Sequence, residues 1–256
     1  MSRLFFCAGA ARGGFVVKFH YMKIQKLFLI LALLVPFAGC GAHKPLQAQQ
    51  QQQVVLNYLS QPAIYYVRDI PPAPLPGSDA DKADFALLHE WQAKRTPAQC
   101  AAAQAQSHAT YEEFFSDISP FPVPLKGEAA QFIGKVSDDG DHTVGAIKSI
   151  YQRPRPFHRD AALDPCLGRI DGLAYPSGHS TRAHIVALVL SDLVPARRAE
   201  FMARADEAAL NRVIGGVHHP SDVAAGAQLA QALYDEMKTR PDFMAEMAVL
   251  RAKLAR

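Results

Sequence analysis

A strongly apolar stretch between Ser177 and Val194, ended by Pro195, constrains the fold of this chain more than any other feature. It predicts a helix, and strand-like alternation is scarce elsewhere in the sequence. Further helices are predicted over Asp79–Lys94, Thr143–Tyr151 and Ala196–Val213, and from a cap at Ser221 to about Lys238. The pattern therefore predicts an all-α protein that folds as a single compact multi-helix domain.

Turns and breaks separate these predicted helices. Asp139-Gly140-Asp141 is typical of a turn before Thr143, and Gly215-Gly216 breaks the chain before the last predicted helix. Arg153-Pro154-Arg155-Pro156 forbids further helix, because the residue before a proline is disfavoured in the helical conformation. The region after residue 151 is therefore expected to be a stiff connection that carries two arginines.

Composition limits the classes of function. Hydrophobic residues make up 49% of the 256 residues, which is enough for the core of one domain of about 200 residues. The formal net charge is +3, and the lysines and arginines are scattered along the chain. This distribution gives no nucleic-acid-binding footprint.

The N-terminal region has the pattern of an export signal. Two lysines after Met22 precede the apolar stretch Leu27–Val35, which is short for a membrane span. Residues 1–42 are expected to be a leader. It ends at Cys40, a candidate lipidation site in a sequence that resembles the end of a lipobox, or after Ala42 without lipid. The mature chain is expected in the periplasm, free or held by a lipid anchor.

The rest of the chain divides at its composition shift. Residues 43–78 are rich in glutamine and proline and are expected to be extended, whereas residues 79–256 form the helical domain. That domain contains Cys100 and Cys166, and two such cysteines in an exported protein most simply form a disulfide. Neither has a Cys or His nearby at a zinc-ligand spacing, so no metal site is predicted.

Three short segments hold the residues suited to chemistry on a phosphoryl group. The first places Lys148 late in a helix and Arg155 in the stiff proline-rich connection, so both cations can point at one site. In the second, Ser177 and Gly178 open the apolar helix, where free backbone N–H groups favour an anion, and His179 lies in its first turn. Taken singly, these segments are also typical of a solvated basic stretch and an ordinary helix cap.

The third segment runs from Arg212 to His218 and Asp222. A carboxylate four residues after a histidine can hold one imidazole nitrogen and leave the other as a nucleophile. His219 is expected to point elsewhere and to be structural. A plain helix–helix turn is the alternative for this segment alone, but three segments in this order and spacing rarely occur by chance.

Together the segments resemble the signature of the type 2 phosphatidic acid phosphatase superfamily, K-x6-RP, PSGH and SR-x5-H-x3-D. The surrounding residues are most similar to its soluble branch, the bacterial class A non-specific acid phosphatases, over roughly residues 80–235. Asn211 departs from the pattern, which has Ser there. The resemblance implies the helical fold shared by acid phosphatases and vanadium-dependent haloperoxidases.

The resemblance also implies roles for single residues. His218 would be the nucleophile that forms a phosphohistidine, Asp222 would orient it, and His179 would be the general acid and later the base. The phosphoryl oxygens would be bound without a metal or cofactor by Lys148, Arg155, Ser177, Gly178 and Arg212. The expected activity is hydrolysis of phosphomonoesters at mildly acidic pH.

Other functions share these motifs. A vanadate-dependent haloperoxidase uses a related site, a lipid phosphate phosphatase has the same motifs on a multi-span membrane protein, and an anion-binding lipoprotein would need no catalysis. The preferred phosphomonoester, transfer of the phosphoryl group to alcohols other than water, and formation of a homo-oligomer are left open by the sequence.

Overall fold

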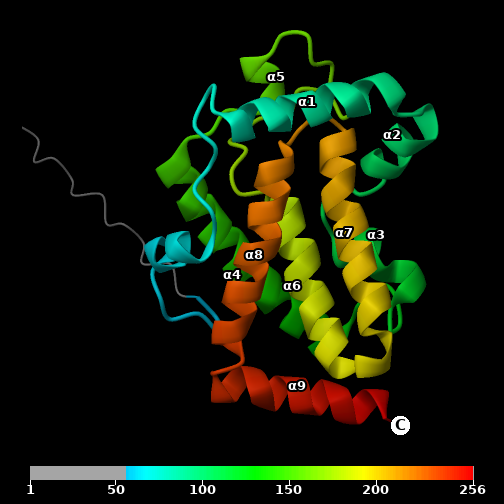
Figure 1. Ribbon diagram of the computed structural model, residues 1–256. Helices are drawn as coiled ribbons and strands as arrows, with labels where there is room; N and C mark the ends of the chain where they lie inside the picture. The colour runs from blue at the N-terminus through cyan, green and yellow to red at the C-terminus, as the bar shows by residue number, and fades with distance from the viewer. Residues whose placement is uncertain (1–55, 256) are drawn as a thin grey trace, which may run out of the picture. The chain divides into compact units, whose positions relative to one another are not determined.

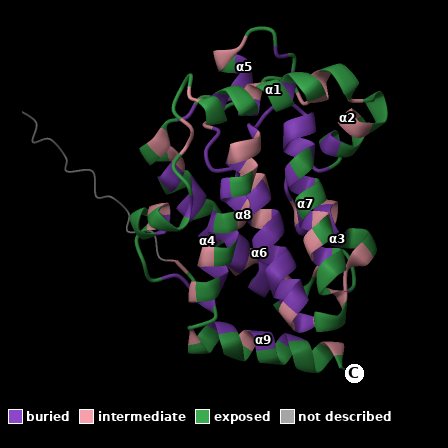
Figure 2. Cartoon of the chain, viewed as in Figure 1, coloured by how far each residue is buried: buried purple, intermediate pink, exposed green. Residues whose placement is uncertain are grey.

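Helix α6 (Gly178–Leu193) lies in the middle of the helical domain and is buried on almost all sides (Figures 1 and 2). The computed structural model describes residues 56–255, which contain no strand. The helix begins where the side chain of Ser177 accepts a hydrogen bond from the Ser180 amide, as the sequence predicts. Its apolar residues Ile185 to Leu190 are buried, so α6 is the central element of the core.

The other long helices pack around α6. Its neighbours are α4 (Gly127–Tyr151), α7 (Arg198–Ile214) and α8 (Pro220–Met237), and α9 (Pro241–Leu254) crosses the far end of the bundle (Figure 1). The helix α1 (Asp79–Lys94) lies across the opposite end of α7 and α8. Shorter elements complete the domain: η1 (Ala63–Asp69), α2 (Pro97–Gln104), α3 (Tyr111–Phe115), η2 (Ser116–Ile118), α5 (Pro156–Arg159) and η3 (Pro195–Arg197).

Two predicted boundaries differ from the structure. The expected turn at Asp139-Gly140-Asp141 is instead part of α4. The buried Asp139 carboxylate accepts hydrogen bonds from the backbone of Asn57 and Tyr58, and these contacts stabilise the helical conformation there. The last core helix begins at Pro220 with His219 as its cap, rather than at a Ser221 cap. The helix α9 follows it and lies beyond the predicted helices.

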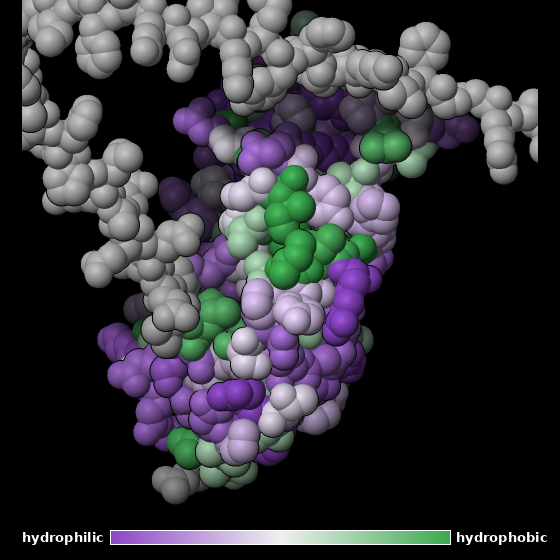
Figure 3. Space-filling model, turned by 90° about the vertical axis from the view of Figure 1, so that its left-hand side faces the viewer, coloured by the Kyte–Doolittle hydropathy of each residue, from purple (hydrophilic) through white to green (hydrophobic). Residues whose placement is uncertain are grey.

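Residues 56–70 pack against the bundle, whereas extended chain was expected over residues 43–78, of which residues 43–55 lie outside the described part of the chain. The amides of Asn57, Tyr58 and Leu59 donate to Asp139, and Tyr58 and Leu59 are buried in the core. The 3-10 helix η1 leaves Ile64 half exposed. On the side of the molecule where η1 lies, Figure 3 shows hydrophobic side chains gathered among hydrophilic ones.

The predicted leader, residues 1–42, and its candidate lipidation site at Cys40 lie outside the described residues. Among the helices of residues 56–255, none has the length and apolar character needed to cross a membrane.

Helices α6 and α8 cross unusually closely at Gly226. A Cβ atom at this position would lie 2.6 Å from the Ser177 carbonyl oxygen and 2.9 Å from the Ser180 Cβ atom. Any larger residue would therefore push α8 away from the start of α6.

Candidate active site

A cavity of about 220 Å³ lies at the start of α6 and brings the three sequence segments together. Its walls come from α4, the start of α5, the first turn of α6, the end of α7 and the connection before α8. The predicted site residues that line it are Lys148, Arg155, Gly178, His179, Arg212 and His218, and the remaining lining residues are His108, Ala109, Asp141, Ile170 and Arg182. Ser177 and Asp222 are fully buried behind the cavity wall.

Lys148 and Arg155 are held by the loop that follows α5. Lys148 donates from Nζ to the Leu173 carbonyl at 2.5 Å, and Arg155 donates from Nε to the Asp171 carbonyl at 3.0 Å. Burial and the nearby Arg155 lower the pKa of Lys148 to about 8, and burial also lowers the pKa of Arg155. Both side chains are thus held in place by backbone carbonyl groups where they line the cavity.

Arg212 is buried, and two of its nitrogen atoms lack a hydrogen-bond partner among the described residues. Its side chain is 2% exposed, and the two nitrogen atoms are Nε and Nη1. Burial, followed by the charge of Arg155, lowers the pKa of Arg212 to about 10. Buried donors without acceptors are costly, and an anion bound at the end of α7 would supply such acceptors.

The second segment supplies a helix start and a histidine. The Ser177 side chain caps α6, and its amide donates to the Asp222 carbonyl at 2.9 Å. Gly178 lines the cavity without a side chain. His179 approaches the Ser107 carbonyl through Nε2 at 3.0 Å, and burial with the charge of Arg212 lowers its pKa to about 3.

The third segment places two histidines around one carboxylate. The Asp222 Oδ2 atom accepts from the His219 amide at 2.7 Å and from the His219 ring at 2.9 Å, and it lies 3.5 Å from Nδ1 of His218. The His219 ring therefore points at Asp222, rather than elsewhere as expected. Burial lowers the pKa of His218 well below its ordinary value. It also works to raise the pKa of Asp222, but the two imidazoles lower that pKa below its usual range.

Arg153 is a buried residue of the site that the predicted set does not include. Its Nη1 donates to the Asp222 carboxylate at 2.6 Å and to the Ser221 hydroxyl at 2.7 Å, and its Nη2 donates to Asp84 at 2.9 Å. It thus ties α1 to the carboxylate beside His218. The doubled Arg-Pro pattern is the only sequence signal for Arg153, because the K-x6-RP spacing from Lys148 selects Arg155.

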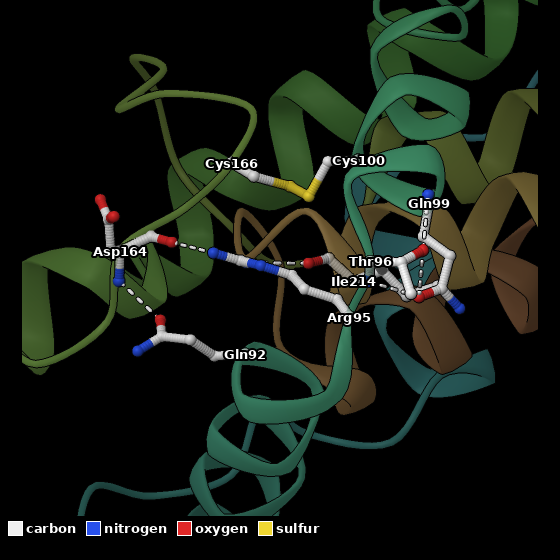
Figure 4. Close-up of a disulfide and its surroundings, with 8 residues drawn as sticks. All are labelled: Gln92, Arg95, Thr96, Gln99, Cys100, Asp164, Cys166 and Ile214. Carbon is white, nitrogen blue, oxygen red and sulfur yellow. Dashed lines mark hydrogen bonds between the residues drawn. A yellow bond between two sulfur atoms is a disulfide. The ribbon is translucent and has the colours of Figure 1, made fainter.

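The structure contains a disulfide between Cys100 on α2 and Cys166 in the loop after α5 (Figure 4). Nearby, Arg95 donates to the carbonyl groups of Asp164 and Ile214. These contacts fasten the loop whose Asp171 and Leu173 carbonyl groups hold the two cations. No cluster of three or more His, Cys, Asp or Glu residues suited to a metal occurs in residues 56–255.

The family model of the PAP2 superfamily matches residues 138–234 of this chain. A non-specific acid phosphatase of Salmonella typhi is 36% identical over 54% of this chain and 56% of its own length. A decaprenylphosphoryl-5-phosphoribose phosphatase of Mycolicibacterium smegmatis is 32% identical over 58% of this chain and 84% of its own length. The chain belongs to the PAP2 superfamily.

A third PAP2 relative, a non-specific acid phosphatase of Providencia stuartii, is 26% identical over 77% of this chain and 87% of its own length. The chain spans about half the length of the Salmonella relatives that it matches. The residues matched by the PAP2 family model include every predicted catalytic and phosphate-binding residue, whereas the turn around Ser107 that contacts His179 lies outside them.

Proposed function

We propose that this PAP2 protein is an acid phosphatase that hydrolyses phosphomonoesters through a phosphohistidine at His218, without a metal. The observation that carries the proposal is the cavity itself. Arg212 lines this cavity together with His218, and its buried Nε and Nη1 atoms have no hydrogen-bond partner among the described residues. Nδ1 of His218 lies 3.5 Å from the Asp222 carboxylate. A phosphoryl group would supply the missing acceptors of Arg212 and bring phosphorus to the imidazole.

The nucleophile is Nε2 of His218. Arg155 approaches this nitrogen through Nη1 at 3.2 Å, and a guanidinium can only donate, so Nε2 carries a lone pair. As Nε2 attacks, a P–N bond forms and the bond from phosphorus to the ester oxygen breaks. Asp222, near Nδ1, stabilises the positive charge that develops on the ring.

His179 transfers the proton. The negative charge of the bound phosphoryl group raises the pKa of His179 from its value of about 3 and so favours the protonated ring. The protonated ring gives a proton to the departing ester oxygen, and the neutral ring then takes one from the water that attacks phosphorus. In the second step the P–N bond breaks, its electron pair returns to His218, and phosphate is released. Lys148, Arg155 and Arg212 bind the equatorial oxygens, where negative charge concentrates in the transition state.

The substrate is proposed to be a polar phosphomonoester. The outer part of the cavity is lined by His108, Asp141 and Arg182, with Ile170 as its large apolar residue. Such a rim favours polar leaving groups over acyl chains. Relatives named lipid A 1-phosphatase and the decaprenylphosphoryl-5-phosphoribose phosphatase make a lipid phosphate the alternative substrate.

The experiment is phosphate release from p-nitrophenyl phosphate at pH 5–6 in excess EDTA, with the His218→Ala variant alongside. We expect turnover that persists in the chelator and is lost in the variant, together with acid-labile, base-stable labelling of the wild type by a radioactive phosphomonoester. Turnover that stops in EDTA would contradict metal independence. An inactive wild type that oxidises bromide when loaded with vanadate, or that hydrolyses only lipid phosphates in vesicles, would replace the proposal.

A further inference from the structure

The contact between His179 and the Ser107 carbonyl determines which nitrogen of this histidine can transfer a proton. Nε2 lies 3.0 Å from the carbonyl oxygen, which can only accept, so Nε2 carries a hydrogen in both the neutral and the protonated ring. Within residues 56–255, Nδ1 of His179 makes no hydrogen bond. Since His179 lines the cavity, Nδ1 is the nitrogen left for the substrate.

The Ser107 carbonyl belongs to the short turn between α2 and α3, and this turn is fastened to α7 by a pair of buried amides. The Asn211 side chain donates from Nδ2 to Oε1 of Gln106 at 2.8 Å, and both residues are less than 10% exposed. Asn211 directly precedes Arg212. One turn of α7 therefore places a cation in the cavity and, through Gln106, holds the carbonyl that contacts His179.

We propose that Asn211 and Gln106 are positioning residues for proton transfer: their amide pair keeps the Ser107 carbonyl on Nε2 of His179 and so reserves Nδ1 for the leaving oxygen. The inference rests on the proposed phosphatase function. In the first step Nδ1–H gives its proton to the ester oxygen as the bond to phosphorus breaks. The ring that remains is neutral, with its hydrogen on Nε2, and Nδ1 then accepts a proton from the attacking water.

Asn211 has a reach that serine lacks. A serine hydroxyl sits on Cβ, one carbon closer to the backbone than the Asn amide nitrogen, and it would not reach Oε1 of Gln106 from the same backbone position. Asn211, which stands where the PAP2 pattern has Ser, therefore makes a connection to the turn that serine would leave open.

Several charged groups act on His179 from the elements around it. The Ser107 carbonyl raises its pKa, whereas burial and the cations of the cavity lower it. Those cations are Arg212 on α7, Arg155 at the start of α5 and Arg182 on α6 itself, and the cavity also contains Lys148 and Asp141 from α4, His108 from the turn, and His218. Loosening the turn removes the contact that favours the protonated ring, so the pKa of His179 in the enzyme–substrate complex should fall.

The test is the pH profile of kcat for the wild type, Asn211→Ala, Asn211→Ser, and the double variant Gln106→Asn with Asn211→Gln, which exchanges the two amide lengths. The basic limb of kcat reports the general acid in the complex. We expect it to move by roughly one pH unit to lower pH in both single variants, since a pKa shift of one unit corresponds to a free energy of the size of one hydrogen bond. The exchanged pair should restore the wild-type limb.

The leaving group gives a second readout. An alkyl phosphate such as glycerol phosphate needs protonation of its leaving oxygen more than p-nitrophenyl phosphate does. In the single variants, kcat should therefore fall several-fold more with glycerol phosphate than with p-nitrophenyl phosphate, while KM stays nearly unchanged for both substrates. Tyr234→Phe is the matched control, because it removes a partly buried hydrogen bond to Asp192 outside the cavity. It should leave the basic limb of kcat and the ratio of kcat values for the two substrates unchanged.

Two results would overturn the inference. Single variants that lose activity or thermal stability while the limb and the leaving-group ratio stay at wild-type values would show a structural role only. If the double variant Gln106→Asn with Asn211→Gln folds but its basic limb of kcat stays shifted to lower pH, the hydrogen bond between the two amides does not position His179. Both results would leave the proposed phosphatase function standing, whereas a wild type inactive on every phosphomonoester would overturn the two together.

Discussion

Nη1 of Arg155 lies 3.2 Å from Nε2 of His218 and 2.9 Å from the carbonyl oxygen of Val217, the residue just before that histidine. One guanidinium therefore fixes both the backbone and the ring of the proposed nucleophile. Because it only donates, it also keeps Nε2 unprotonated. An arriving phosphoryl group would take over the Nη1 hydrogen bond and free the lone pair for attack.

Removal of Arg212 should weaken transition-state binding more than substrate binding. Arg212→Ala deletes a guanidinium whose Nε and Nη1 atoms have no partner among the described residues. By analogy with the loss of one oxyanion-hole donor, we expect kcat to fall by about 10²–10³-fold. Steady-state kinetics with p-nitrophenyl phosphate measure this effect. A loss smaller than fivefold would show that the unpaired N–H groups do not serve the reaction.

Lys148 should set an upper pH limit for phosphate binding. Its pKa is lowered to about 8, so the cation is present below that pH in the free enzyme and is lost as the pH rises through it. Affinity for inorganic phosphate should therefore fall above about pH 8, as measured by titration calorimetry. Lys148→Arg is the matched control, because an arginine stays charged, and it should remove this fall. A decline of equal size in the arginine variant would assign it to another group.

Arg153 should be needed for stability as well as for activity. Arg153→Gln would leave the buried Asp84 and Asp222 carboxylates without their shared cation. Breaking such a buried pair costs about 3–5 kcal/mol of unfolding free energy. Urea denaturation measures the change, with Arg68→Gln at an exposed ion pair as the control. Equal midpoints for the two variants would contradict the role of Arg153.

The disulfide should contribute through the long loop that it closes. Cys100 and Cys166 are 66 residues apart, and closing a loop of this length stabilises the folded state by about 4 kcal/mol in the chain-entropy model. The double serine variant should unfold at lower urea concentration, and reductant should lower the midpoint of the wild type alone. A reductant effect in the serine variant would point to a different cause.

Local patterns in the sequence carried much of the fold. The apolar run of α6, its Ser177 cap and the glycines after α7 are signals within a few residues, and those helices lie close to their predicted positions. The turn predicted at Asp139 was wrong. The local composition favours a turn, but the Asp139 carboxylate accepts hydrogen bonds from the amides of Asn57 to Leu59, and these stabilise the helix. The residues that donate lie about 80 positions away in the sequence, so no local pattern indicates them.

The site shows the same division. Motif spacing was enough to predict that Lys148, His179 and His218 meet in one cavity. It was not enough to find Arg153, since its partners Asp84 and Asp222 lie on separate helices. Contacts of this kind depend on how α1 and α8 pack, and no short pattern in the chain encodes them.

The close crossing at Gly226 ties the geometry of the proposed reaction to one absent methyl group. The Ser177 amide donates to the Asp222 carbonyl there, so the start of α6, which contains His179, is joined directly to the start of α8, which holds Asp222 near His218. A side chain at residue 226 would increase the distance between the imidazoles of His179 and His218, although the sequence of every motif would be unchanged. Such a variant would keep every motif residue and still lose the distance between His179 and His218 that the proposed reaction needs.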